Sequence, residues 1–401
     1  MKRNVIRPVW PWGSARCIER APAEMSPPRY HVAVIGGGPA GLAAAVVLVR
    51  DGLDVIVIER TDYHSLRVGE HVAPNVKPLV ATLGLSCVFE SARHASCPGI
   101  RSLWGGREPV DRDYLFHPHG EGLNLSRPDF DSSFAALAES LGADIVTSAR
   151  TTGITRSRGS WEISLERERQ ASRIRADIVI DATGRAASIA KRLGAKPIVY
   201  DRLIGIVGRT AGSSPLDHSI AIEALETGWW YSAGLADGIL IATFLTDSDL
   251  VETSKTGRAS TWWRQLQASD ITAGRIVATG SAMDLDIRSA RTQRLDVTVG
   301  EGWLAVGDAA MSFDPLSSEG ISKGLEWGRK AAELAVAFCR GDRSAARAYR
   351  EQLDKAFSEY LLTRYRYYAT ETRWPGAPFW RRRQRAPRPL AGSAAGSSTN
   401  W

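Results

Sequence analysis

Apolar and polar positions alternate along the chain in blocks that predict strands and helices. The run at 30–35 (YHVAVI) is apolar and β-branched and ends at glycine, whereas 39–51 has the Ala, Leu and Val composition of a helix. The run at 54–58 (DVIVI) repeats the buried-strand pattern. These three elements predict a β-α-β unit. The pattern also predicts a helix and two strands further along, at 130–141, 143–146 and 176–181.

The second half of the chain begins with a different pattern. Residues 219–246 contain three strand-like runs separated by turns, SIAIEAL, GWWYSAGL and ILIATFLT. They predict an antiparallel sheet that forms the wall of a substrate domain. A long amphipathic helix is predicted at 317–340, with its start at Asp314-Pro315, and a helix rich in Tyr and Arg at 344–370.

Composition and charge distribution narrow the function classes. The chain has 401 residues, 44% of them hydrophobic, which is enough for two domains with substantial cores. The formal net charge is +7, but the excess lies in the two ends, and the body between 29 and 370 is close to neutral. Nucleic-acid-binding proteins carry a basic stripe instead, and no apolar run here reaches the length of a bilayer span. We therefore expect neither nucleic acid nor a membrane as a partner.

The cysteines and the two ends bear on the cellular compartment. The chain has four scattered cysteines, Cys17, Cys87, Cys97 and Cys339. They lack metal-ligand spacing and are too dispersed for a disulfide framework, so we expect reduced thiols, no metal and a cytoplasmic protein. Residues 1–28 are basic but lack the apolar core of a secretory signal, and we predict a disordered leader. The Pro, Ala, Gly and Ser composition of 386–401 predicts a disordered tail.

The β-α-β unit contains a glycine-rich turn between its first strand and its helix, Gly36-Gly37-Gly38-Pro39-Ala40-Gly41. The first motif glycine allows the tight turn, the second lets the backbone approach a pyrophosphate, and the third lets the helix pack on the strand. Phosphate then lies at the helix N-terminus, where free N–H groups and the dipole favour negative charge. Glu59 ends the second strand with Arg60 beside it, and a carboxylate there accepts hydrogen bonds from ribose hydroxyls. The motif predicts FAD or NAD.

Two further motifs lie at strand ends. Residues 181–185 (DATGR) close one apolar run, and 302–310 (GWLAVGDAA) carry Gly-Asp after another. With these motifs the chain resembles, over roughly residues 30–385, the superfamily of FAD-dependent aromatic hydroxylases and tryptophan halogenases. The resemblance implies an α/β fold in which a Rossmann-like FAD-binding domain is interleaved with an antiparallel β-sheet substrate domain, followed by a helical C-terminus.

The patterns and the resemblance together give expected domain boundaries. The FAD-binding domain is predicted to comprise 29–84, 126–195 and 290–340. The remaining segments are 85–125 with 196–289 for the substrate domain, and 341–385 for the C-terminal helices.

The resemblance also implies which residues lie at the flavin. The family aspartate that bonds the ribityl chain corresponds to Asp308, and a family arginine near the diphosphate corresponds to Arg127. The segment 314–321 (DPLSSEGI) resembles the loop that passes the reactive edge of the isoalloxazine and opens a helix, whose N–H groups would stabilise reduced flavin. Its candidate residues are Pro315 and Ser317 for catalysis, and Gly320 and Ile321 for cofactor binding.

A second flavin segment is implied at 66–74 (LRVGEHVAP). Its glutamate lies near the active site in the halogenases, which makes Glu70 and His71 candidates for polar, catalytic roles near the ring. A solvated loop position is the alternative reading for each of the two side chains.

Four reactions are compatible with this superfamily. A monooxygenase forms a flavin C4a-hydroperoxide in a dry pocket and transfers its distal oxygen to an electron-rich ring. In a halogenase, chloride attacks that hydroperoxide and hypohalous acid reaches the substrate through a lysine. The same fold also supports a flavin-dependent alkene reductase and a non-catalytic FAD-binding protein.

The sequence departs twice from the halogenase pattern. The family Trp-x-Trp-x-Ile-Pro is replaced by GWWYSA at 228–233, and the stretch 95–105 offers Arg101 where a lysine is sought. An always-charged guanidinium replaces such an amine poorly. Trp229 and Tyr231 fall on one face of their predicted strand, and with Arg101 they are the candidate residues of the substrate pocket. Packing in the core of the sheet is the alternative role for the two aromatic residues.

The sequence therefore predicts an FAD-dependent monooxygenase that hydroxylates an aromatic substrate. Tryptophan and other indole-containing compounds are among the candidate substrates. The aromatic group belongs to a small molecule or to a peptide or protein. The C-terminal run 365–383 and GWWYSAGL resemble the branch of flavoproteins that assist the maturation of tryptophylquinone enzymes. O₂ is the expected co-substrate, and NAD(P)H supplies electrons either directly or through a partner flavin reductase.

Overall fold

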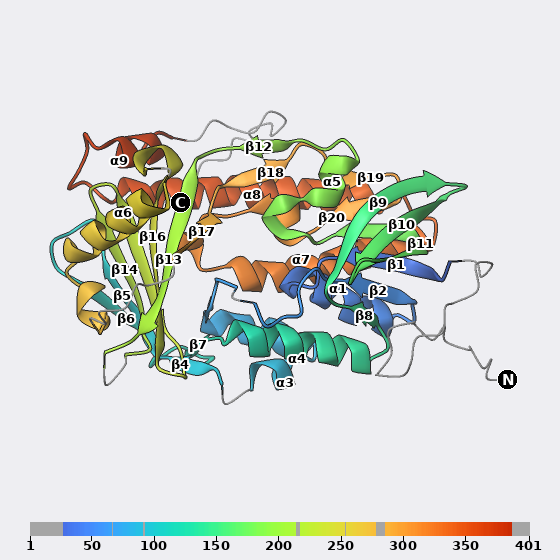
Figure 1. Cartoon of the computed structure of the whole chain (residues 1–401), viewed down its shortest axis with the longest axis horizontal. Coiled ribbons are helices and arrows are strands. Elements are labelled where there is room, and N and C mark those ends of the chain that lie inside the picture. Colours follow the sequence, from blue (N-terminus) through green and yellow to red (C-terminus); the bar gives the residue numbers. More distant parts are fainter. Residues whose placement is uncertain are drawn as a thin grey trace, which may run out of the picture.

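The computed structural model describes residues 27–386, except 66, 91–92, 214–216, 253 and 278–284. The disordered ends predicted at 1–28 and 386–401 lie almost wholly outside these residues. Figure 1 shows two sheets at opposite ends of an elongated molecule, with long helices running between them. This arrangement confirms the predicted α/β fold with a Rossmann-like part, a sheet domain and a helical C-terminus.

One end of the molecule is built on an eight-stranded sheet with the central order β19-β20-β11-β1-β2-β8. Its strands are β1 Arg29–Ile35, β2 Val55–Ile58, β8 Asp144–Val146, β11 Gln170–Asp181, β19 Val299–Gly300 and β20 Trp303–Ala305. An antiparallel ribbon of β9 (Ala149–Ser157) and β10 (Ser160–Arg167) extends β11. The pairs β1·β2, β1·β11, β2·β8 and β11·β20 are parallel, so their carboxyl ends share one edge.

Helix α1 (Pro39–Arg50) is buried over most of its length. It lies against α4 (Arg127–Ser140) and α7 (Gly320–Cys339). A Cβ at Gly328 of α7 would lie 2.4 Å from the carbonyl oxygen of Ala40, so only glycine allows this spacing. The close packing of α1 on α7 brings the start of one helix near the start of the other.

The other end is a seven-stranded sheet with the order β17-β13-β16-β15-β14-β5-β6. The strands are β5 Gly99–Leu103, β6 Val110–Asp113, β13 Leu203–Ala211, β14 Ile220–Leu225, β15 Gly228–Gly234, β16 Ile239–Asp247 and β17 Leu285–Ser289. All pairs are antiparallel except β14·β5, which confirms the sheet predicted at 219–246. Helix α6 (Lys255–Gln267) covers one face through Trp262, which packs on Trp230.

Short elements complete the structure. Two three-stranded sheets have the orders β12-β18-β21 and β3-β7-β4. Their strands are β3 His71–Val72, β4 Ala95–Cys97, β7 Gly122–Asn124, β12 Pro197–Val199, β18 Gln293–Leu295 and β21 Met311–Ser312. The short helices are α2 Lys77–Thr82, α3 Ser86–Phe89 and α5 Ser188–Arg192, with 3-10 turns at Pro74–Val76, Gly184–Ala186, Ser248–Leu250, Ala273–Arg275, Gly307–Ala309 and Pro315–Ser317.

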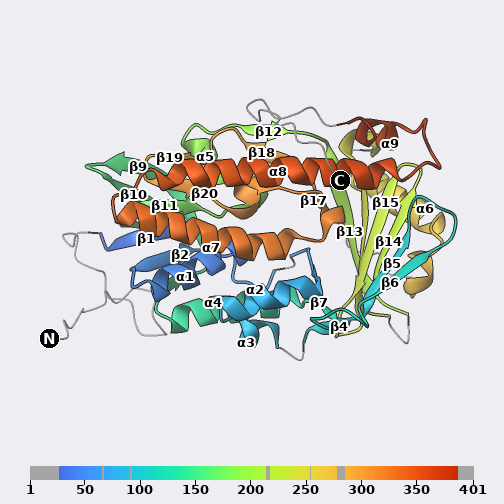
Figure 2. The same cartoon turned by 180° about the vertical axis from the view of Figure 1, so that it is seen from behind.

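The C-terminal helices connect the two sheets. Helix α8 (Ala345–Ala369) confirms the helix predicted at 344–370 and runs along the molecule from the eight-stranded to the seven-stranded sheet (Figure 2). Helix α9 (Pro378–Arg383) then buries Phe379 and Trp380 against the seven-stranded sheet. Over the described ranges, every helix is too short or too polar to cross a lipid bilayer.

The predicted start of the long helix at Asp314-Pro315 is wrong. Pro315 begins a 3-10 turn, Ser318 has a left-handed backbone (φ 51°), and α7 begins only at Gly320. The Asp314 carboxylate accepts a hydrogen bond from the Leu316 N–H at 3.1 Å, which closes the short turn. Because a left-handed residue interrupts the hydrogen-bond ladder, the helix cannot extend back to the proline.

Candidate functional site

Three sequence motifs meet at one edge of the eight-stranded sheet. In the parallel ladder, Ile35 pairs with Asp181 and Asp181 pairs with Ala305, so β1, β11 and β20 end side by side. The glycine turn, the DATGR segment and the Gly-Asp turn follow these ends directly. Parallel sheets of this kind bind ligands outside the carboxyl ends of their strands. The sheet topology thus assembles a candidate nucleotide site from segments far apart in the sequence.

The glycine turn forms a cradle that side chains would fill. Gly36 has φ 111°, and a Cβ there would lie 2.2 Å from the Ala182 carbonyl oxygen. A Cβ at Gly41 would lie 2.0 Å from the Gly36 carbonyl oxygen, so neither position accepts a side chain. Gly38 caps α1 without a side-chain hydrogen bond, and a Cβ there would meet open space. The first turn of α1 begins at Pro39, which has no N–H, and the free N–H groups that follow it, from Ala40 on, are available to a ligand of the phosphate type.

Glu59 is held rigidly beside this cradle. Its carboxylate, 5% exposed, accepts hydrogen bonds from the Gly37 N–H at 2.8 Å and from the Thr61 N–H at 2.9 Å. The Arg67 guanidinium donates to the same carboxylate at 2.8 Å and also pairs with Asp131 at 3.2 Å. Arg67 belongs to a segment that the sequence analysis quoted without choosing this residue. The predicted neighbour Arg60 is exposed.

Asp308 lies at the opposite side of the cradle in the turn Gly307–Ala309. Its carboxylate is partly exposed and pairs with the Arg185 guanidinium at 3.3 Å. Arg185 also donates to the backbone oxygens of Arg291 and Phe313, each at 2.6 Å. Arg185 thus joins the Gly-Asp turn to Phe313, the residue before Asp314. Arg185 belongs to the DATGR motif, but no local pattern in the sequence indicates this contact.

The segment 314–320 leads from this region into α7, and it is called the flavin-edge loop below because the family resemblance predicts that role. Pro315 and Ser317 lie in its 3-10 turn, and a Cβ at Gly320 would meet open space. The Ile321 side chain is 6% exposed and packs in the core, so any contact between this residue and a cofactor falls to its backbone. The loop places the N-terminus of α7 beside the start of α1.

A cavity of about 310 Å³ lies between the FAD-binding part and the seven-stranded sheet. Glu70 lines it with 2% of its surface exposed, and neither carboxylate oxygen has a hydrogen-bond partner among the described residues. Burial raises the pKa of Glu70, and the Arg127 guanidinium only partly opposes this shift. Burial raises the pKa of the Tyr231 phenol, and the negative charge of the nearby Glu70 carboxylate raises it further. The Tyr231 hydroxyl also stabilises the carboxylate and so opposes the rise of the Glu70 pKa, although no hydrogen bond of full geometry joins the two groups. A buried carboxyl in this state can accept a hydrogen bond from a ligand.

Arg127 holds the segment that carries Glu70. Its guanidinium donates to the backbone oxygens of Val68 and Gly69 at 2.6 and 3.1 Å, and it pairs with Asp131 at 3.0 Å. The Arg127 Nε is buried without a partner among the described residues. Because Arg67 and Arg127 share Asp131, the candidate diphosphate arginine is linked to the Glu59 cluster.

His71 points away from the cavity into the small sheet β3-β7-β4. Its Nδ1 lies 3.3 Å from the Asn124 side-chain oxygen, and its Nε2 lies 3.4 Å from the Tyr114 hydroxyl. Burial lowers the pKa of His71 to about 4, although the contact with Asn124 opposes the shift. These contacts support a neutral, structural imidazole.

The neutral His71 gives an expected pH dependence of stability. The unfolded chain takes up a proton near pH 6.5, whereas the folded imidazole stays neutral down to about pH 4, so stability is lost as the pH falls through this window. We expect a loss of at most about 3 kcal/mol from this group. Denaturant unfolding between pH 7 and 4 measures it, and His71→Asn should flatten the curve. An equally steep curve for the variant would contradict this assignment.

The candidate substrate residues do not gather in one place. Trp229 and Tyr231 share the face of β15 that packs toward α8 and α9, but Trp229 is fully buried and donates from Nε1 to the Tyr368 hydroxyl at 3.0 Å. Arg101 pairs with Ala221, which lies on the opposite face from Ile222 and Tyr231. Arg101 is bonded there to Asp111 at 2.7 Å. The structure thus separates Arg101 from the face that carries Trp229 and Tyr231, because strand side chains alternate between faces.

The cradle, the buried acid at the end of β2 and the open helix start define a dinucleotide-binding protein, and the chain matches the family described as FAD binding domain over residues 29–347. The chain belongs to this family. The glycine positions and the partly exposed Asp308 fit FAD on their own geometry. The described residues contain no group of three or more His, Cys, Asp or Glu side chains arranged to hold a metal ion.

Relatives identify the kind of FAD-binding protein. The "Putative FAD-dependent oxidoreductase LodB" of Marinomonas mediterranea is 30% identical over 361 residues, which cover 88% of this chain and 96% of the relative. A tryptophan 2-halogenase of Chondromyces crocatus is 22% identical, and the match covers 80% of this chain and 64% of that enzyme. The chain is therefore an FAD-dependent oxidoreductase, as the sequence analysis predicted.

Solved structures share the fold. The peptidyl tryptophan dihydroxylase QhpG, essential for tryptophylquinone cofactor biogenesis, superposes with a TM-score of 0.77 at 25% identity, covering 92% of this chain and 82% of that one. The chondrochloren halogenase CndH superposes with a TM-score of 0.80 at 20% identity, covering 89% and 86%. Hydroxylases and halogenases are both present among the similar proteins, which confirms the predicted superfamily.

Proposed function

We propose that the protein is an FAD-dependent monooxygenase that hydroxylates an aromatic ring, and that this ring is the indole of a tryptophan within a peptide or protein. The observation that carries the proposal is the cavity beside Glu70. Its described lining contains arginines, carboxylates and apolar residues but no lysine. The similarity to the peptidyl tryptophan dihydroxylase QhpG across 92% of this chain supports hydroxylation, and the similarity to LodB supports an FAD-dependent oxidoreductase.

The residues of the site bind different parts of FAD in this proposal. Gly36, Gly38 and Gly41 with the start of α1 bind the diphosphate, Glu59 accepts from the adenosine ribose, and Asp308 accepts from the ribityl chain. FAD, reduced by NAD(P)H directly or through a partner reductase, supplies the activation of O₂. The N–H groups at the start of α7, which follows the flavin-edge loop, would stabilise negative charge on a reduced flavin bound beside them. The chain itself thus binds, orients and excludes water.

Glu70 is the proposed proton acceptor. When an oxygen atom adds to an aromatic carbon, that carbon must lose its proton to restore the ring, while the second oxygen atom leaves as water. The buried Glu70 carboxylate beside the cavity accepts the proton of the ring or of the indole N–H. Because burial raises the pKa of Glu70, its carboxylate is a stronger proton acceptor than an exposed carboxylate.

Halogenation is the second candidate function, and the names of several relatives favour it. The lysine nearest the flavin-edge loop is Lys323 on α7. It pairs with Glu319 at 2.7 Å, lies 4.1 Å from the Phe313 ring centroid, and does not line the cavity. Arg101, the basic residue of 95–105, is paired on the outer face of the sheet. Neither Lys323 nor Arg101 lines the cavity beside Glu70.

The function is tested with the FAD-loaded protein, a flavin reductase with NADH, isotopically labelled O₂, and tryptophan-containing peptides in buffer with or without chloride and bromide. We expect the peptide to gain one or two labelled oxygen atoms, with equal yield in halide-free buffer. A halogenated product that requires halide would replace the hydroxylase assignment by the halogenase one. Reductant consumption without labelled product, together with reduction of an added alkene, would favour the reductase.

A further inference from the structure

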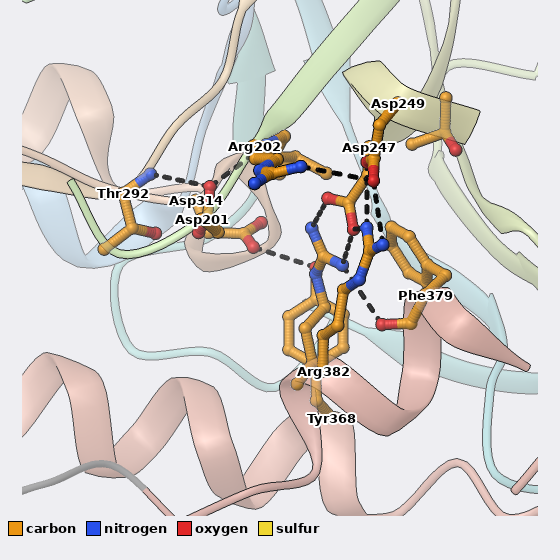
Figure 3. Close-up of polar contacts among 12 residues, drawn as sticks. Asp201, Arg202, Asp247, Asp249, Thr292, Asp314, Tyr368, Phe379 and Arg382 are labelled. Carbon is orange, nitrogen blue, oxygen red and sulfur yellow. Dashed lines mark hydrogen bonds and ion pairs between the residues drawn. The ribbon is translucent and has the colours of Figure 1, made fainter. Parts of the chain in front are cut away.

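The first residue of the flavin-edge loop is held from the C-terminal helix. The Asp314 carboxylate, 1% exposed, accepts hydrogen bonds from the Arg364 Nε at 3.1 Å and from the Tyr368 hydroxyl at 2.8 Å. The Asp314 N–H donates to the Tyr360 hydroxyl at 2.7 Å. Figure 3 shows Asp314, Asp201 and Tyr368 within one polar cluster. Three side chains spaced by four residues along α8 therefore define the position of Asp314.

The same cluster joins α8 to the seven-stranded sheet. Trp229 of β15 donates from Nε1 to the Tyr368 hydroxyl, which in turn donates to Asp314. Leu316, in the turn that Asp314 caps, packs against the aromatic cluster formed by Trp229 and its neighbours. A continuous path of contacts thus runs from the substrate-side sheet through α8 to the flavin-edge loop.

Arg364 is fixed from both sides. It pairs with Asp201, between β12 and β13, at 2.9 Å as well as with Asp314. Burial alone would lower the pKa of Arg364, but the two carboxylates raise it above its ordinary value, so the guanidinium stays charged. The cluster continues to Asp247, which accepts from Arg383 at 2.6 Å and from Arg382 at 2.8 Å (Figure 3).

Stability alone is a weak reason for such a cluster. Buried ion pairs contribute little net stability compared with well-packed apolar side chains, because desolvation offsets their attraction. They do impose one geometry, since each donor must meet its acceptor at a fixed distance and angle. The loop that they fix carries Pro315, Ser317 and Gly320, whose backbone leads into α7.

We propose that Arg364 and Tyr368 are positioning residues that set the flavin-edge loop through Asp314 and couple this loop to Trp229 on the sheet. The proposal rests on the proposed function only in taking this loop as the one at the reactive edge of the flavin. The reduced flavin carries negative charge, and the loop stabilises it only while its N–H groups keep their direction. Loss of the contact of Arg364 or Tyr368 with Asp314 should therefore lower the reduction potential of the bound FAD.

The test compares Tyr368→Phe and Arg364→Lys with the wild type, all as FAD-loaded full-length chains. Each variant removes one contact to Asp314 and keeps the size or charge of the side chain. We expect both variants to retain FAD, to lower the reduction potential by an amount equivalent to about fivefold in the equilibrium constant, and to shift the visible absorption bands of the flavin. Faster amide exchange at 311–325 in the FAD-free protein is expected as well.

Tyr349→Phe is the matched control. Tyr349 is an equally buried tyrosine on α8, but its hydroxyl donates to the Ala305 carbonyl at 3.1 Å and does not contact Asp314. It should reproduce any general loss of helix stability without faster exchange at 311–325. Potentials and spectra of Tyr368→Phe and Arg364→Lys equal to those of the control and the wild type would overturn the proposal. Because these readouts need no substrate or oxygen, they remain decisive if the hydroxylase assignment fails.

Discussion

Gly38→Asp is expected to weaken FAD binding by more than about 100-fold without lowering the stability of the FAD-free protein. Gly38 has φ −82° and ψ −178°, which any residue adopts, and a Cβ there meets nothing within 4 Å. An aspartate at this N-cap accepts hydrogen bonds from the first turn of α1 and stabilises the helix. It also places a negative charge where the diphosphate of FAD is expected. At about 5 Å and an effective dielectric constant near 20, this repulsion costs about 3 kcal/mol, or more than about 100-fold in affinity.

The measurement is FAD fluorescence titrated with the FAD-free protein, together with thermal unfolding without FAD. Gly376→Asp is the matched control, because Gly376 is exposed and its Cβ also meets open space, but it lies in the loop before α9. The control should bind FAD as the wild type does. If Gly38→Asp retained wild-type affinity, the diphosphate would have to lie elsewhere, and the nucleotide site described above would be wrong.

Glu70→Gln is expected to slow hydroxylation by about 100-fold and to make the protein more stable at neutral pH, since general bases contribute this order of magnitude to rate. The folded pKa of Glu70 is raised above its unfolded value. The group therefore favours folding fully below the unfolded pKa, and this contribution is lost as the pH rises through the folded pKa. Removing the ionisable carboxyl should raise the unfolding temperature at pH 8 while FAD binding is unchanged.

Glu223→Gln supplies the comparison. Glu223 is as buried as Glu70, but its carboxylate accepts from the backbone N–H groups of Asp270, Ile271 and Thr272. Glutamine offers these N–H donors one oxygen acceptor in place of two. This variant should therefore unfold at a lower temperature and keep its turnover. If Glu70→Gln behaved in the same way, Glu70 would be a structural residue and the proton would have another acceptor.

The elements that form the candidate nucleotide site were largely predictable from the sequence because their signals are local. A glycine turn between a strand and a helix, an acid at the end of the next strand and Gly-Asp after a third strand each follow from short patterns. Parallel pairing then brings the ends of β1, β2, β11 and β20 to one edge. The segments meet because the sheet is parallel, and the apolar runs already indicated buried strands of that kind.

Arg101 and Pro315 show where local patterns fail. The pairing register of β5 with β14 turns Arg101 to the outer face, and a shift of one residue would have turned it inward. Asp314-Pro315 is a typical sequence for the start of a helix. In the structure, however, the left-handed Ser318 ends the 3-10 turn Pro315–Ser317 before α7 begins. A register and a backbone angle each depend on neighbouring elements that a local pattern does not contain.

The sequence by itself determined the strands, the helices and the nucleotide cradle, because periodicity and glycine positions are properties of short segments. Only the tertiary structure decided that Glu70 is buried without a partner, that Arg67 bonds Glu59, and that α8 holds Asp314. These contacts join residues from separate elements, in the last case 50 positions apart. Burial and hydrogen bonding depend on which surfaces meet, and that is fixed only when the two sheets and α8 pack together.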